Sequence, residues 1–153
     1  MDTKILISTI NEIIKYGVNP NLKMENEELK LEKNLVKIYD LFFEINYEFD
    51  DTDYGEFETT QLTNIRSNIE SNFKNFGLYK TLIDIQNIND ISTCAIGDAI
   101  DDLSDITIDL SEIKWRLENN SINDGLWFFE LCFRSHMQQH ILSLLNYMKN
   151  LNG

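Results

Sequence analysis

The chain has 153 residues, a length typical of one domain with its own core, and 42% of the residues are hydrophobic. Charged residues make up 25%, which fits a folded globular protein and argues against global disorder. There are 26 Asp and Glu against 13 Lys and Arg, so the net charge is −13. This charge argues against direct nucleic-acid binding and against docking on anionic lipid, because both need clustered cations. We therefore expect a single domain, residues 1–153.

We expect neither an export signal nor a membrane-spanning segment in this sequence. No apolar run approaches the ~20 residues that cross a membrane, and the N-terminus lacks a basic region followed by an apolar block and a cleavage site. The two cysteines, Cys94 and Cys132, do not make a disulfide framework. These features predict a cytoplasmic location.

Apolar residues recur at helical spacing along the first half of the chain. Residues 3–16 form one such helix, and Gly17 is expected to take the left-handed position that ends it before Pro20. Asn26 is expected to cap a second helix, and residues 59–76 give a third. The second helix also carries a second apolar row, which suggests burial on two sides. That row is Val36, Phe43 and Tyr47.

Two longer helices are expected in the second half of the chain. Ser92 can cap a helix running to about Glu118, and Ser121 and Asp124 have capping-box spacing for a last helix to about Leu151. This last helix is apolar on two sides, as is usual for the central helix of a bundle. One side includes Phe129, Phe133, Met137 and Leu144, and the other carries Trp127, Leu131, Leu142 and Leu145. We predict an all-α bundle of about five helices with the C-terminal helix central.

Two segments carry a resemblance to a known family. They are the run Leu126-Trp127-Phe128-Phe129 with Ser135-His136-Met137-Gln138-Gln139-His140, and the run Gly97-Asp98-Ala99-Ile100-Asp101-Asp102. Together they resemble the C-terminal signature of a bacterial family, domain-of-unknown-function family five thousand and sixty-three. Met137, Gln138 and Phe129 depart from the residues usual there. The resemblance implies a helical fold. It implies nothing about activity, because the family has no known function.

The histidine pair His136 and His140 is the first candidate site. Residues four apart on a helix present both imidazoles on one face, as paired metal ligands do. Asp102 borders the apolar stripe of the preceding helix, so a His136/His140/Asp102 cluster could hold a divalent ion between two packed helices. Core histidines paired to other groups explain the same pattern, and a proton switch is a further alternative. In the core interpretation, both rings are buried and hydrogen-bonded.

An acidic stripe on the same preceding helix is the second candidate site. From residue 81 to 113 there are eight acids and no Lys or Arg. A purely structural surface would usually intersperse cations, so the stripe suggests a landing surface for a basic partner, although a solvated helix face is the alternative. We expect its carboxylates to be exposed and to have no Lys or Arg partner within the chain. The stripe is Asp98, Asp101, Asp105, Asp109 and Glu112.

These patterns favour a non-catalytic module that binds a basic protein, for example an immunity or antitoxin-type protein that occludes a basic effector. No cofactor is expected in that case. The alternative is a divalent-metal-binding helical bundle, or a metal-dependent hydrolase, that uses His136 and His140 with Asp102. The oligomeric state is not indicated by the sequence.

Overall fold

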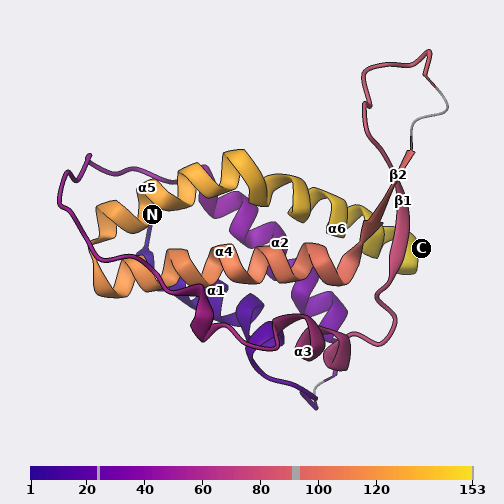
Figure 1. Cartoon of the computed structure of the whole chain (residues 1–153), viewed down its shortest axis with the longest axis horizontal. Coiled ribbons are helices and arrows are strands. Elements are labelled where there is room, and N and C mark those ends of the chain that lie inside the picture. The colour runs from indigo at the N-terminus through magenta and orange to yellow at the C-terminus, as the bar shows by residue number, and fades with distance from the viewer. Residues whose placement is uncertain (24, 91–93, 153) are drawn as a thin grey trace.

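A computed structural model describes residues 1–23, 25–90 and 94–152 (Figure 1). It is a mostly helical bundle, as expected, but it is not strictly all-α, because two strands form an antiparallel hairpin. Among the described residues, no helix is long and apolar enough to cross a membrane. The elements are α1 (Thr3–Val18), α2 (Glu27–Phe42), the short helix η1 (Thr59–Gln61), α3 (Ile65–Asn72), β1 (Leu78–Leu82), β2 (Cys94–Asp98), α4 (Ala99–Asn119), α5 (Ile122–Cys132), the π-helical segment η2 (Phe133–Met137) and α6 (Gln138–Asn152).

The central element is α4, which packs against α1, α3, α5 and α6 (Figure 1). Its apolar row is buried from Ala99 to Ile113, and small side chains on the same helix, Ser104 and Thr107, are buried as well. The prediction that the C-terminal helix is central is wrong. Phe129, Phe133 and Leu144 are buried on one side of that helix, but Trp127 and Leu131 are exposed on the other. The reason is that α4 lies between α1 and α3 on one side and the C-terminal helix (α5, η2 and α6) on the other. The C-terminal helix therefore covers α4 from outside.

The last helix begins at the expected capping box: the Ser121 side chain accepts a hydrogen bond from the backbone N–H of Asp124 at 3.0 Å. It is not a regular α-helix throughout, because the η2 segment between α5 and α6 has a wide π turn. Such turns are frequent at functional sites. Nothing in the residue pattern indicated it.

The first half of the chain differs from expectation at its helix ends. Gly17 is buried within α1 and is not left-handed; Asn21, Asn26 and Asn64 are the described residues outside glycine with positive φ. Asn26 does occupy the N-cap position of α2, but without a side-chain hydrogen bond to the helix. Val36 of α2 is exposed, as is Phe43 just after the end of α2, so the helix is not buried on two sides.

Two expected helices are shorter in the structure. Only Ile65–Asn72 (α3) is α-helical within the span 59–76, and β2 occupies the first turns expected of the next helix. In the hairpin, Leu78 pairs with Asp98 and Leu82 with Cys94. The expected Ser92 cap lies outside the described residues. Asp98 caps α4 instead, its side chain accepting from the Ile100 N–H at 3.0 Å.

Gly17 permits the close approach of α1 and α4. A Cβ at this position would lie 2.6 Å from Cγ2 of Thr107, a buried side chain. Replacing glycine by alanine inside a helix usually stabilises it by about 1 kcal/mol. Gly17→Ala is expected instead to lower the free energy of unfolding by about 1–3 kcal/mol, because it overpacks the contact.

Chemical denaturation measures this change. Gly55→Ala is the matched control, because nothing lies within 4 Å of a Cβ at Gly55. A Gly17→Ala protein more stable than the parent by about 1 kcal/mol would show that the two helices can separate at no cost.

Candidate metal centre

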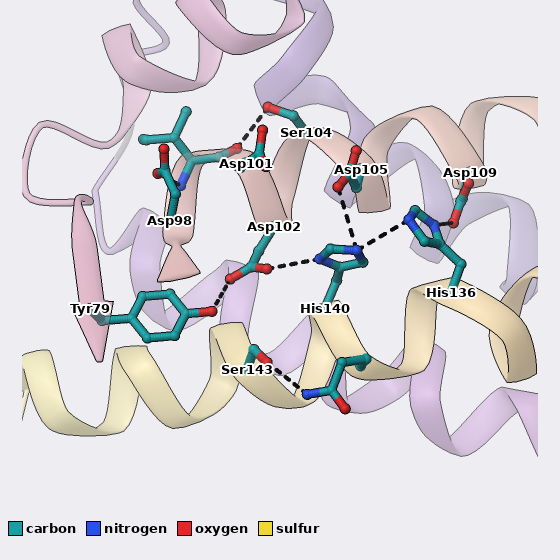
Figure 2. A network of polar contacts seen from close by, with 12 residues as sticks. Tyr79, Asp98, Asp101, Asp102, Ser104, Asp105, Asp109, His136, His140 and Ser143 are labelled. Carbon is teal, nitrogen blue, oxygen red and sulfur yellow. Dashed lines mark hydrogen bonds and ion pairs between the residues drawn. The ribbon is translucent and has the colours of Figure 1, made fainter. Parts of the chain in front are cut away.

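The candidate centre lies between α4 and the C-terminal helix (Figure 2). α4 carries Asp102, Asp105 and Asp109, which share one helix face because they are three and four residues apart. His136 comes from the π turn, and His140 from the start of α6. The packing of these two helices therefore places three carboxylates opposite two imidazoles.

Each imidazole uses its Nδ1 atom to bind a carboxylate. His140 Nδ1 lies 2.8 Å from Oδ1 of Asp102, and His136 Nδ1 lies 2.8 Å from Oδ2 of Asp109. The two Nε2 atoms then face one another at 3.2 Å, and His140 Nε2 lies 3.4 Å from Oδ2 of Asp105. Both histidines thus turn the same ring atom toward one point (Figure 2).

These contacts fix where the ring hydrogens lie. An ionised carboxylate only accepts hydrogen bonds, so Nδ1 of His136 and of His140 carries a hydrogen. In a neutral imidazole the lone pair is then on Nε2. Two lone pairs and the carboxylate of Asp105 would therefore converge, which is unfavourable unless a proton or a metal cation lies among them.

The hairpin supports His140 through Asp102. Tyr79 of β1 donates its phenolic hydrogen to the second carboxylate oxygen of Asp102. Its ring lies against Gly97 of β2, where a Cβ would overlap it, and 5.3 Å from the ring of Tyr147. Burial, with the hydrogen bond to Asp102, raises the pKa of the Tyr79 phenol, so it remains a donor. The hairpin thus holds Asp102 in position.

Burial and neighbouring charges shift the pKa values of His140 and Asp105 in the centre. The hydrogen bond to Asp102 raises the pKa of His140; burial opposes this, and the charges of Asp102, Asp105 and Asp109 reinforce it. Burial also raises the pKa of Asp105, against the attraction of the histidines.

Cys132 lies one turn before His136, but burial raises the pKa of its thiol to about 12, which disfavours the thiolate that binds metals.

The three atoms that could bind a metal ion come from Asp105, His136 and His140, and all lie within 4.8 Å of one another. The cluster expected from the sequence, His136, His140 and Asp102, is therefore wrong at one position: Asp105 takes the place of Asp102. The two histidines do meet, but Asp102 holds the Nδ1 side of His140, and Asp105 faces its Nε2. The expectation that both rings are buried is also wrong for His136, whose side chain is 48% exposed.

The acidic stripe is not the unpartnered surface that was expected. Arg66 of α3 lies 2.6 Å from Asp98 and 3.4 Å from Asp101. Arg116 binds Glu112 at 2.8 Å, as their spacing of four residues allows. Asp105 and Asp109 turn toward the histidines. The expectation is wrong because Arg66 and Arg116 both lie outside residues 81–113. Only tertiary packing brings Arg66 of α3 to α4.

Sequence reasoning missed Asp109 and Tyr79 as members of the centre. Asp109 was assigned to the solvent stripe, although its spacing from Asp102 and Asp105 places all three on one face. Tyr79 carried no signal, because its contact depends on how the hairpin meets α4.

Comparisons of the chain with family models, with curated proteins and with solved structures give no match. The resemblance of the C-terminal signature to domain-of-unknown-function family five thousand and sixty-three therefore stays a prediction.

The Asp102–His140 contact makes the metal-free protein sensitive to pH. The folded-state pKa of His140 is raised above its ordinary value of 6.5, so the contact stabilises the fold fully below that pH. This stabilisation is lost as the pH rises through the folded-state pKa. We expect NMR titration in the presence of a chelator to give His140 a pKa above 6.5, and Asp102→Asn to lower it. A His140 pKa that is unchanged in Asp102→Asn would contradict the role given to this hydrogen bond.

Proposed function

We propose that this protein binds a divalent cation of the zinc class through Asp105, His136 and His140. The observation that carries the proposal is the convergence of two Nε2 lone pairs and one carboxylate, with both Nδ1 atoms held by other carboxylates. A cation at this point would replace the mutual repulsion of the three groups by attraction. It would also link α4 to the C-terminal helix.

The spacing of the three groups supports a tetrahedral ion. Zinc binds imidazole nitrogen and carboxylate oxygen at about 2.0–2.2 Å, which separates neighbouring ligand atoms by about 3.3–3.5 Å. The Nε2 atoms are 3.2 Å apart, and Nε2 of His140 is 3.4 Å from Asp105. The remaining separation, between Asp105 and His136, is at most 4.8 Å, and the Asp105 side chain is one-third exposed and can rotate to close it.

The surroundings favour the same class of ion. Imidazole and carboxylate ligands suit zinc and its neighbours among the divalent transition metals. Metal-bound histidines usually donate their other ring N–H to a carboxylate, as His136 does to Asp109 and His140 to Asp102. Three protein ligands leave a fourth position for water or another ligand, and the exposure of His136 places this position near solvent.

The hypothesis of an immunity-type module that occludes a basic effector has less support. Its basis was the one-sign stripe, whose acids have partners within the chain. The net charge of −13 remains in its favour, because a strongly acidic surface attracts basic partners over a distance. A metal-dependent hydrolase would need a substrate cleft at the fourth position, which no described contact supports.

Metal binding is tested directly on untagged protein. Isothermal titration with zinc, and the visible absorption of the cobalt-loaded protein, are expected to give one ion per chain. His140→Ala or Asp105→Asn is expected to abolish this binding, because each removes a ligand. Asp102→Asn is expected to weaken it by about 10–100-fold, because it frees the ring orientation of His140.

Asp101→Asn is the matched control for Asp102→Asn. It removes the same charge from the neighbouring residue, whose side chain is 66% exposed and paired with Arg66. Long-range electrostatics alone would make the two substitutions equivalent. Equal weakening, or zinc binding that survives His140→Ala, would contradict the proposed centre, as would a folded parent protein that binds no zinc.

A further inference from the structure

A second feature, unrelated to the metal centre, is an apolar face formed by α2 and the C-terminal helix. A groove of about 310 Å³ runs between the two helices. Val36, Tyr39 and Asp40 line it from α2, Phe43 from just after the end of α2, and Leu142 and Leu145 from α6. Gln138 donates to the Tyr39 hydroxyl at 2.8 Å and ties the helices together there. We call this surface, with the adjoining hollow described next, the α2–α6 face.

The hollow extends the groove toward α5. It has a volume of about 390 Å³ and is lined by Tyr47, Trp127, Leu131 and Arg134, among others. The guanidinium of Arg134 stacks over the Phe42 ring, and that ring lies beside Phe43 of the groove. The groove and the hollow therefore lie next to each other along these helices.

This face collects the two apolar rows that the fold leaves uncovered. Val36 and Phe43 are seven residues apart on α2, the spacing of helices that pack side by side. They are 54% and 64% exposed, and Leu131 and Leu142 are about half exposed. Rows of this kind on two neighbouring helices are the pattern expected of a surface that another helical pair covers.

The charges around the face suit a second copy of the chain. The chain as a whole has 26 acids and 13 bases, so most surfaces of two copies repel each other. Around Val36, Phe43, Trp127, Leu131, Leu142 and Leu145, the charged residues next in sequence or one helical turn away are four bases and five acids. They are Lys33, Lys37, Arg134 and Lys149 against Glu32, Asp40, Glu44, Asp124 and Glu130.

The area is also sufficient for a dimer. Trp127 and the four exposed residues above present on the order of 500 Å² of apolar surface, taking about 150–250 Å² for each complete large side chain. Interfaces are about 55–65% apolar, so the polar rim brings this to about 800 Å² per copy. That is the usual contribution of one partner to a stable complex.

We propose that two copies of this chain associate through the α2–α6 face, related by a two-fold axis. The two helices of each copy would then pack against those of the other, and the nearly balanced charges around the face would repel each other less than those of the rest of the surface. The exposed apolar residues of the hairpin, such as Leu78 and Ile96, are a less suitable surface. The hairpin, residues 78–98, carries Asp84, Asp90 and Asp98 against Lys80 alone, so two hairpins would each bring a net negative charge.

Sedimentation equilibrium over a series of protein concentrations tests the dimer, with a chelator present so that the result does not depend on metal binding. The parent protein is expected to be dimeric. The double variant Val36→Glu/Leu142→Glu is expected to raise the dissociation constant at least about 100-fold, because each dimer would bury four uncompensated charges. Both residues are about half exposed in the monomer, so the fold and its circular dichroism should not change.

The matched control is Leu78→Glu/Ile96→Glu, the same chemical change at two hairpin positions that are 71% and 65% exposed. This control is expected to remain dimeric. The melting temperature of the parent and of the control should rise with concentration, whereas that of the groove variant should not. The proposal is overturned by a parent that is monomeric at sub-millimolar concentration, by a groove variant that still dimerises, or by a hairpin variant that does not.

Discussion

The packing of α4 against the C-terminal helix is the constraint on which the rest of the structure depends. α4 has helices on several sides, so its apolar row is buried and its polar flank faces a neighbour instead of solvent. Asp102, Asp105 and Asp109 are consequently half-buried or more, where an unpaired carboxylate is unfavourable. His136 and His140 supply the compensating groups. The pairing of these residues is thus needed by the packing before it serves any function.

The same packing explains why the centre is poised to take up positive charge. Because Asp102 and Asp109 occupy the Nδ1 atoms, the Nε2 atoms are left to face Asp105 and each other. Tyr79 restrains Asp102 from the hairpin, so the geometry depends on four elements and not on one helix alone. A proton satisfies the arrangement in the metal-free protein, and a divalent cation would satisfy all three groups together.

The same arrangement explains why the outer side of the C-terminal helix is exposed. Since α4 takes the central position, the C-terminal helix needs only one apolar side for the core, and its second side joins Val36 and Phe43 of α2 at the surface. The proposed metal centre lies between α4 and the C-terminal helix, whereas the α2–α6 face lies between α2 and the C-terminal helix. The proposed dimer and the proposed metal site therefore use different residues.

The sequence by itself determined most of the helices, though not their ends, as well as the capping box at Ser121 and the presence of two histidines on one helix face, because these depend on residues close together in the chain. Which helix is central was decided by tertiary structure, since two-sided apolar helices occur both in cores and at surfaces. Tertiary packing also decided that Asp105, and not Asp102, faces Nε2 of His140, and that Arg66 neutralises Asp98. The physical reason is that the spacing along a helix fixes which side chains share a face, whereas the partner of that face depends on the rotation and approach of another helix.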